Sequence, residues 1–476
     1  MISSRREAVQ IFLSSTVSKI GVSLLVILLA FSIYTLAAFP PDYGRLVWNN
    51  PKAWENYPKS APPSWINVFT GFKHFEHGVL EPGKPVAFRT PDGAMKTIYH
   101  FTLEYTADEF PTFFSISLRD LRYWDVPPIL TVRLVRPDGK AINLMSFAAP
   151  PPRDGEKPPY TRFVEEPLTI KIDSDVNVWR SVSAFLKENY GIELSPSKIG
   201  ENPGQYLFGS PIEGNFSKPM KGEYSFEVVA TLHDERDSLG HVSLILGGSV
   251  YGLLGTDVIG RDIAIGVLLG FPISLFIGII TSVAVTLIGG LLGIVSGYIG
   301  GKTDEVIQRI SDVVYNLPLL PLTIFLIFLM GSSIWNIILL LIVFGWPGLT
   351  ILARSIALQL RESQFIEASR TFGSSAWRII FKHMLPQVTP FIVAEMIFFV
   401  PTFILLEAAL SFLGLGDPSL PTWGQMLELG FRNGAIYLGL WWWIIPPGLM
   451  IVLTAFTFVL IALGMEPVVN PRLRTG

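Results

Sequence analysis

Long apolar segments are the feature of this sequence that most restricts its fold. An α-helix needs about 20 apolar residues to cross the hydrocarbon core of a lipid bilayer, which is about 30 Å thick. Six runs near that length occur, covering residues 20–39, 271–297, 314–330, 334–353, 388–412 and 441–463. The sequence therefore predicts an α-helical membrane protein with six transmembrane helices.

The composition places the chain in the same class. Of its 476 residues, 50% are hydrophobic and 16% are charged, which is far from the average of soluble proteins. The chain has no cysteine, which excludes disulfides, thiol catalysis and cysteine metal sites. The formal net charge of -3 gives no reason to predict a nucleic-acid partner, because the location of the charges matters more than their sum.

The first apolar run is typical either of a secretory signal peptide or of a membrane span. Its apolar stretch is long for a signal peptide, and no clear small-residue cleavage site precedes the segment FPPDYG at residues 39–44. We therefore interpret residues 20–39 as an uncleaved first helix that follows a short N-terminal segment, residues 1–19.

Basic residues gather on one side of the predicted helices. They lie before the first run and after the second, fourth and sixth: Arg5, Arg6, Lys19, Lys302, Arg309, Arg354, Arg361, Arg370, Arg378, Lys382, Arg472 and Arg474. The opposite loops are poor in them, since the loop after the fifth run has only Arg432. The positive-inside rule then makes both termini, including the tail 466–476, cytoplasmic. It places residues 40–250 outside the cytoplasm, in a multi-pass protein of the cell membrane.

Residues 40–250 differ in pattern from the rest of the chain. Prolines cluster there, and apolar and polar residues alternate at residues 99–105, 114–119 and 223–228. The turn signal RPDGK at residues 136–140 predicts a β-hairpin, and a helix is expected near residues 175–190, ended by Gly191. We expect a β-rich, sandwich-like domain inserted between the first two helices. The other five helices would form a core over residues 251–465.

Two short motifs in this domain have both a functional and an ordinary interpretation. Asn215-Phe216-Ser217 fits the N-glycosylation sequon, although such triplets are common by chance. His74 and His77 are residue types that bind metal, but no third ligand accompanies them, and a solvated loop is the simpler explanation. We keep Asn215 as a glycosylation candidate and predict no metal site.

The segment SGYIGGKT, residues 296–303, is close to a phosphate-binding P-loop. That pattern requires a glycine five places before Gly301, where this chain has Ser296, and it follows a strand rather than an apolar helix. The glycines more simply end the second span. No serine elbow, paired-carboxylate cleft or metal-binding helix motif stands out either. We predict no catalytic residues and no cofactor bound by this chain, so work driven by ATP would need a partner.

Glu395 and Glu407 lie in or near the fifth apolar run. A carboxylate in lipid is costly, so such a residue faces a bundle interior or a water-filled cavity. Glu407 is also compatible with the outer interface, and a buried structural role competes with a pathway role for Glu395. Both are retained as candidates for an aqueous pathway through the bundle.

The segment between the fourth and fifth runs, residues 363–387, is polar, basic and longer than a turn requires. Ser363 is positioned to cap a first helix, and Gly373 supplies the left-handed residue that ends it. Ser374 or Ser375 would cap a second helix that runs through Met384. Such a pair is either an amphipathic element on the membrane surface or a docking element for a cytoplasmic protein.

The spacing in this segment resembles the EAA loop of ABC-importer permeases, in which a Glu-Ala-Ala triplet, a glycine and a Leu-Pro pair follow one another. In the loop 361–387 the matching residues are Glu367, Ala368, Ser369, Gly373, His383, Leu385 and Pro386. Ser369 stands where the pattern has its second alanine, which is a small departure.

Four other stretches resemble the C-type permease subunit of the dipeptide/oligopeptide group. LGTDVIGRD before the second run contains Asp257, Gly260, Arg261 and Asp262. RISDVVYNLP lies at the third run, EAALSFLGLGDPSLPTWGQML follows the fifth, and EPVVNPRL closes the chain, with glutamate where the family usually has aspartate. The resemblance covers roughly residues 250–473 and the first span. The β-rich insert departs from the family, whose loop after the first span is much shorter.

The resemblance implies a permease of a type I ABC importer, which is not itself an enzyme. A second permease subunit would complete the pathway, and two cytoplasmic ATPase subunits that bind ATP and Mg would contact the EAA residues. An extracytoplasmic solute-binding protein would deliver peptides or, alternatively, oligosaccharides. A membrane-anchored sensor with a ligand-binding β-domain is the alternative of a different class. An ion channel is less well supported, because no charged ring or selectivity-loop pattern is present.

Overall fold

The computed structural model describes residues 5–91, 94–211 and 216–469. The chain divides into a helical unit, Met1–Pro51 with Ile263–Gly476, and a β-rich unit, Lys52–Asp262. Each unit has a hydrophobic core of its own. The predicted glycosylation residue Asn215 and the tail arginines Arg472 and Arg474 lie outside the described residues, as do the side chains of Arg5 and Arg6.

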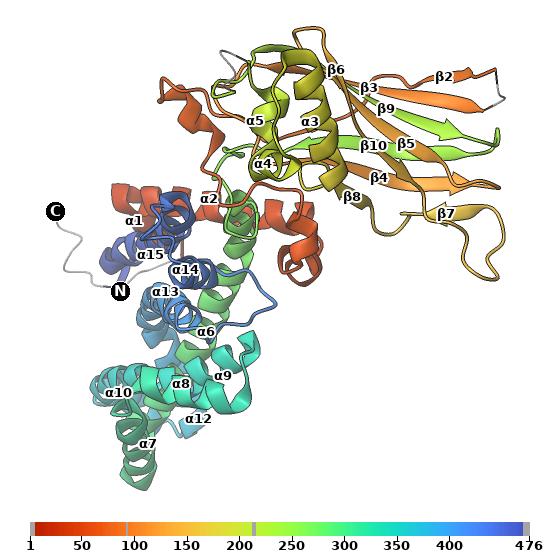
Figure 1. Cartoon of the computed structure of the whole chain (residues 1–476). Coiled ribbons are helices and arrows are strands. Elements are labelled where there is room, and N and C mark those ends of the chain that lie inside the picture. The colour runs from red at the N-terminus through yellow and green to blue at the C-terminus, as the bar shows by residue number, and fades with distance from the viewer. Residues whose placement is uncertain (1–4, 92–93, 212–215, 470–476) are drawn as a thin grey trace. The chain divides into compact units, whose positions relative to one another are not determined.

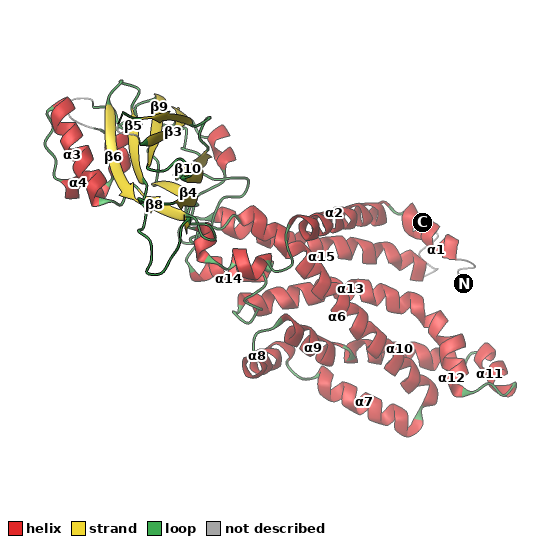
Figure 2. Ribbon diagram, turned by 90° about the vertical axis from the view of Figure 1, so that its right-hand side faces the viewer, coloured by secondary structure: helices red, strands yellow, loops and turns green. Residues whose placement is uncertain are grey.

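Five helices of the helical unit are long and apolar enough to cross a membrane. They are α2 (Thr16–Ala38), α6 (Ile263–Ile299), α9 continued by α10 (Ile334–Gly345, Pro347–Arg361), α13 (Leu385–Phe412) with the turns before it, and α15 (Trp441–Val469). Shorter helices flank them: α1 (Arg5–Ser14), α7 (Gly301–Tyr315), α8 (Leu319–Met330), α11 (Gln364–Thr371) and α14 (Trp423–Arg432). In Figure 2, α13 lies between α6 and α15, and α15 packs against α2.

The helix predicted over residues 314–330 is instead two helices. Helices α7 and α8 meet at an angle of 83° across Asn316–Pro318. A proline disfavours helical geometry in the residue before it, which explains the break. The 12 residues of α8 extend about 18 Å, too short for the hydrocarbon core. The described residues thus contain five helices of spanning length, or six if this bent pair counts as one span.

A stripe of glycines on α6 allows α10 to pack closely against it. Gly289, Gly293 and Gly297 are spaced four residues apart and therefore share one face. A Cβ added at Gly293 would lie 2.6 Å from the Cβ of Ala353, and one at Gly297 would lie 2.7 Å from the Cβ of Ala357. Small residues permit such close backbone approach, which drives helix association in membranes.

The β-rich unit contains two five-stranded sheets with antiparallel pairing (Figure 1). The first comprises β1 (Gly78–Leu80), β10 (Ser238–Leu246), β4 (Phe114–Tyr123), β7 (Tyr160–Arg162) and β8 (Leu168–Lys171). The second comprises β2 (Val86–Arg89), β3 (Met95–Tyr105), β9 (Gly222–Leu232), β5 (Ile129–Val135) and β6 (Ala141–Ala148). The prediction of a β-rich region is confirmed, and the RPDGK turn joins β5 to β6 as a hairpin.

Period-two alternation sends one face of each sheet into a common core. Phe101 in β3 and Leu134 in β5 both pair in register with Phe226 in β9, and all three side chains are at most 1% exposed. Phe114 and Leu246 form the corresponding buried pair between β4 and β10 of the first sheet. The apolar residues of the alternating segments are therefore the ones that hold the two sheets together.

Helix α3 (Val176–Tyr190) confirms the helix expected near residues 175–190 and packs against β6 (Figure 1). The Asp175 side chain accepts a hydrogen bond from the N–H of Asn177, and Gly191 ends the helix at φ +70°. The six-residue helices α4 (Pro196–Glu201) and α5 (Pro203–Phe208) were not predicted, because each is too short to show helical periodicity.

The β-rich unit should lose stability between pH 6.5 and 4 because of His77. The ring lies among the rings of Tyr57, Phe113 and Tyr251, and burial lowers the pKa of His77 to about 4. The unfolded chain then binds more protons than the folded one in this window, so stability falls as the pH drops, by at most about 3 kcal/mol.

The thermal unfolding midpoint of the β-sheet circular dichroism, measured for the full-length chain in detergent, checks this expectation. His77→Phe keeps the aromatic packing and removes the titration, so it should lose much less stability than the wild type between pH 6.5 and 4. Equal losses in the two proteins would show that His77 is not responsible.

Candidate functional site

The segment after α10 folds into two short helical pieces joined at Gly373. Helix α11 carries the first, and α12 (Ala376–Arg378) continues into a π-helical turn, Ile379–Met384, before α13 begins. Gly373 has φ +75°, in the left-handed region that favours glycine. Ser375 accepts a hydrogen bond from the N–H of Arg378 and so caps the second piece.

The capping predicted for Ser363 is wrong in one respect. Ser363 has the extended backbone of an N-cap, but its hydroxyl donates to the carbonyl oxygen of Leu360 at 2.6 Å and makes no cap hydrogen bond to α11. The second piece is also not one regular α-helix through Met384. Pro386 has no N–H with which to continue the α-helical ladder, and the N–H of Leu385 instead donates to the carbonyl of Ile380, five residues earlier.

Buried apolar side chains attach the helix pair to the membrane helices. Ile366 from α11 packs in one cluster with Ile379, Ile380 and Met384 of the π-turn, and all four are at most 2% exposed. The same cluster includes Ile294 of α6, Ala357 of α10 and Val388 of α13. The pair is therefore fixed to three long helices rather than suspended from a flexible turn.

The opposite side of the helix pair is exposed. Glu367 and Ala368 are exposed on α11, and Ser369 is partly so. Phe372 is 87% exposed and Trp377 58% exposed. Together with Phe365 and Phe381, these residues form an exposed aromatic surface that carries the Glu367 carboxylate, and we call it the outer face of the helix pair. The same segment also exposes the basic residues Arg370, Arg378 and Lys382.

The remaining residues of the EAA-like motif, His383, Leu385 and Pro386, make contacts or hold positions within the helices. The ring of His383 meets that of Phe365 edge to face, with centroids 5.3 Å apart, and thereby bridges the two pieces. Leu385 and Pro386 occupy the first turn of α13, a position that tolerates proline.

An ion pair beside the helix pair was not predicted as a site. Arg354 of α10 contacts both carboxylate oxygens of Asp304 in α7, through Nε at 2.6 Å and Nη2 at 2.5 Å. Ser296 of α6 donates to the same carboxylate at 2.5 Å, so the network joins three helices. An arginine near an apolar run needs a polar partner, and this requirement could have indicated from the sequence that Arg354 forms an ion pair. The sequence analysis counted Arg354 only for membrane orientation.

The motif LGTDVIGRD forms a tight buried loop in the β-rich unit. Asp257 accepts the backbone N–H groups of Ile259, Gly260 and Arg261 through Oδ1, while Oδ2 lies 2.6 Å from Nε of Arg261. A Cβ at Gly260, which has φ +102°, would lie 3.0 Å from the Trp54 carbonyl oxygen. Asp262 forms an isolated antiparallel bridge with Thr256. These family residues hold a loop together.

The two glutamates of α13 differ in their surroundings. Glu407 is 2% exposed, and its Oε1 accepts a hydrogen bond from Ser411 at 2.6 Å. Ser411 in turn lies 3.4 Å from the hydroxyl of Thr422, the N-cap of α14. This cluster ties α13 to α14 and buries the Glu407 side chain. Glu395 is only partly buried on the same helix.

The SGYIGGKT segment and the His74/His77 pair were considered as phosphate-binding and metal-binding motifs, and the structure shows the surroundings of each. Gly300 and Gly301 have positive φ at the junction of α6 and α7, and a helix precedes them. Nδ1 of His74 lies 3.3 Å from Glu109, whereas His77 lies among aromatic rings. No group of three or more histidine or acidic residues that could hold a metal ion occurs within the described ranges.

Residues 289–475 match the family described as the binding-protein-dependent transport system inner membrane component. The chain is also 38% identical over 221 residues to the dipeptide transport system permease protein DppC of Bacillus subtilis, which covers 46% of this chain and 68% of that protein. It belongs to this family of ABC-importer permeases. The match to the DppC protein of Lactococcus lactis is 34% over 301 residues, covering 62% and 83% of the two chains. The glutathione transport system permease protein GsiD of Pectobacterium atrosepticum matches at 34% over 244 residues, or 51% and 80%.

The family model covers the part of the helical unit that runs from within α6 through α15, whereas α1, α2 and the first part of α6 lie outside the matched residues. The resemblance to type I ABC importers is thereby confirmed, and the protein is a multi-pass membrane permease. The family match does not cover the β-rich unit.

Proposed function

We propose that this chain forms half of the translocation pathway of a peptide importer, together with a second, related permease subunit. The observation that carries the proposal is the helix pair of residues 364–384. Its buried root is the apolar cluster that contains Ile366 and Ile380, and its outer face exposes aromatic side chains and the Glu367 carboxylate. Peptides are favoured as cargo because the relatives are named dipeptide, oligopeptide and glutathione transport permeases.

In this proposal the outer face docks in a groove of a cytoplasmic ATPase subunit. Glu367 makes a charged contact there, and Gly373 sets the angle between the two pieces. The ATPase subunits bind ATP and Mg, and closure of their dimer moves the docked pair. Because Ile366 and Ile380 root the pair among α6, α10 and α13, the movement passes to the membrane helices and alternates access to the pathway. Glu395 is the candidate for a pathway residue, and the burial of Glu407 favours a structural role.

The proposed orientation has both termini and the helix pair in the cytoplasm and the β-rich unit outside. An extracytoplasmic solute-binding protein then approaches the β-rich unit first. We infer that this unit docks or retains that protein, with a simple spacer role as the competing explanation.

Replacing Lys52–Asp262 by a short glycine–serine linker should lower the affinity for the solute-binding protein at least tenfold. These bounds follow the unit and spare Trp48, which lies against Gly266 of α6 in the helical unit. Binding-protein affinity and peptide uptake are measured on the assembled importer in proteoliposomes, with ATPase binding as the control for correct insertion. Unchanged affinity and uptake would leave the spacer explanation.

The function is tested by reconstituting the permease pair with its ATPases and solute-binding protein. Peptide-loaded binding protein should stimulate ATP hydrolysis and peptide uptake together. Stimulation by an oligosaccharide instead would assign the cargo to sugars. A chain that binds ligand but assembles with no ATPase would identify a membrane-anchored sensor and end the importer proposal.

A further inference from the structure

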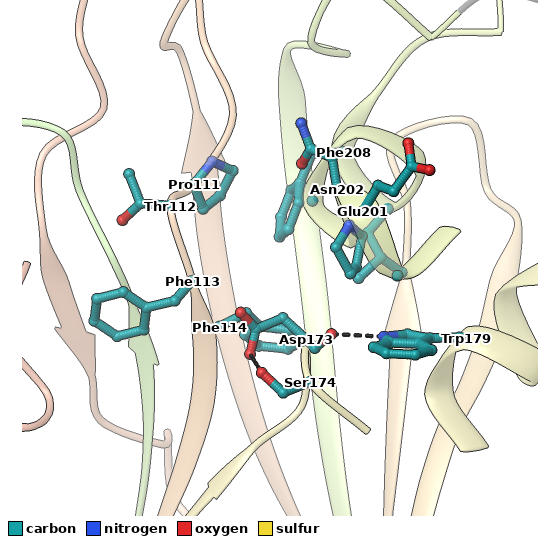
Figure 3. A pocket seen from close by; sticks show the side chains of 14 residues that line it. Pro111, Thr112, Phe113, Phe114, Asp173, Ser174, Trp179, Glu201, Asn202 and Phe208 are labelled. Atoms are coloured by element: carbon teal, nitrogen blue, oxygen red, sulfur yellow. Dashed lines mark hydrogen bonds between the residues drawn. The ribbon is translucent and has the colours of Figure 1, made fainter. Parts of the chain in front are cut away.

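Two hollows of the β-rich unit adjoin the turn that precedes α3. One has a volume of about 430 Å³ and lies between the start of β4, this turn and the α4–α5 junction (Figure 3). The other, of about 500 Å³, lies between β4 and residues 55–60. Thr112, Phe113, Asp173 and Ser174 line both hollows. Each volume is within the range of small-molecule sites.

Asp173 is the acidic group that the two hollows share. Its backbone carbonyl accepts a hydrogen bond from Nε1 of Trp179 at 2.7 Å, which fixes the turn (Figure 3). Ser174 donates to its carboxylate at 3.4 Å, and partial burial raises the pKa of Asp173. Lys171, the nearest basic residue along the chain, lines the second hollow and pairs with Glu55 at 3.3 Å, and its charge acts on the Asp173 carboxylate without forming an ion pair with it. Within the described ranges, no basic side chain lies within ion-pair distance of Asp173, so a cationic ligand would find this carboxylate available.

A second polar group points to a ligand. Ser115 of β4 lines the hollow beneath residues 55–60 and is 1% exposed. Its neighbours Phe114 and Ile116 are core residues, so Ser115 faces the opposite side of the sheet, toward the hollow. Among the residues that the structure describes, its hydroxyl has no hydrogen-bond partner. Burying an unpartnered hydroxyl is unfavourable, and a ligand amide in this hollow would supply the missing bond.

Aromatic side chains give both hollows apolar walls. Phe113 lines both, and Trp179 lines the first. Gly200 packs directly on the indole of Trp179, since a Cβ there would lie 2.8 Å from the ring. A few polar groups set among aromatic walls are characteristic of sites that orient a small ligand.

We propose that the two hollows form one binding site for a short peptide, whose protonated amino group pairs with the Asp173 carboxylate and whose backbone bonds to the Ser115 hydroxyl. The β-rich unit then holds cargo in its own right, in addition to any contact with a solute-binding protein. The inference rests on the proposed function only for the choice of a peptide over another primary amine.

The test is calorimetric binding of trialanine to the purified full-length chain in lipid nanodiscs, without ATPases or solute-binding protein. We expect saturable binding, with N-acetyl-trialanine at least tenfold weaker because it lacks the charged amino group. Asp173→Asn should weaken trialanine binding at least tenfold and abolish the difference between the two peptides. Asp154→Asn removes an exposed acid elsewhere in the unit and should leave both affinities unchanged.

Ser115→Ala should weaken trialanine binding severalfold without altering the preference for a free amino group. Absence of binding to the wild type, or equal affinities for the two peptides, would overturn the proposal. If Asp173→Asn fails to fold, the acetylation comparison on the wild-type chain decides. Equal affinity for trialanine and a simple alkylamine would overturn the peptide assignment. Peptide uptake by the assembled importer is measured separately, so a chain that transports peptide without binding trialanine refutes only this inference.

Discussion

Glu367→Lys should lower peptide uptake at least tenfold while the permease still inserts in the membrane. Glu367 is exposed on α11, so the substitution does not disturb the buried root of the helix pair. It does reverse a charge at the proposed ATPase contact, where an ion pair at 4 Å is worth about 4 kcal/mol near a protein surface. The initial rate of ATP-driven uptake into proteoliposomes measures the effect. Glu362→Lys, an equivalent reversal of an exposed residue just after α10, is the matched control and should transport nearly normally.

Gly373→Val should uncouple peptide uptake from the ATPases, and so lower the rate of ATP-driven uptake in the same assay, for a different reason. A β-branched residue is strongly disfavoured at φ +75°, so the two helical pieces must change their angle. Gly373→Asn is the control, because asparagine tolerates left-handed backbone, and no neighbouring atom lies within 4 Å of the new Cβ. Normal uptake by both Glu367→Lys and Gly373→Val would remove the helix pair from the coupling mechanism.

Asp257→Ala should destabilise the β-rich unit by about 3–5 kcal/mol, the usual cost of taking one partner from a buried ion pair. The Asp257 and Arg261 side chains are 1% and 5% exposed, and the substitution also removes the acceptor of three backbone N–H groups. Denaturant unfolding of the full-length chain, followed by the β-sheet circular dichroism, gives the change in free energy. Asp125→Ala, at an exposed bend, should change it little. A loss below about 1 kcal/mol for Asp257→Ala would mean that the ion pair does not hold this loop.

The membrane helices were predictable because length and apolar composition suffice to indicate them. The third run was predicted as one straight helix, and its bend was not predicted, because hydropathy does not register backbone geometry. Residues 314–330 are apolar enough for a span, yet the Asn316–Pro318 segment bends the chain by 83°. The proline was visible in the sequence, but prolines inside α6 and α13 are accommodated without such a break. Tertiary packing decides between these outcomes.

The helix pair was predictable from local signals, and its root was not. Serine, glycine and proline positions indicated two pieces and a turn, but not the π-turn at Ile379–Met384. The contact of Asp304 with Arg354 joins residues 50 positions apart. Sequence spacing cannot show that such distant residues form an ion pair. In the same way, the glycine stripe of α6 can be recognised as a packing surface only once α10 is known to be its neighbour.

In the β-rich unit, too, local features were predictable from the sequence and a feature that depends on tertiary packing was not. Its strands followed from alternation, and its hairpin from RPDGK. The proposed trialanine site was not predictable, because Ser115 and Asp173 line one hollow only when β4 and the turn before α3 pack together. Neither residue belongs to a motif.

The central claim is that the outer face of the helix pair docks on an ATPase. The chain has no cysteine, so Ala368→Cys creates a single attachment point for a photo-reactive maleimide on the exposed face of α11. In an assembly that transports peptide, illumination should link this residue to an ATPase subunit. A link to the solute-binding protein, or to no ATPase at all, in an assembly that still transports would contradict the claim.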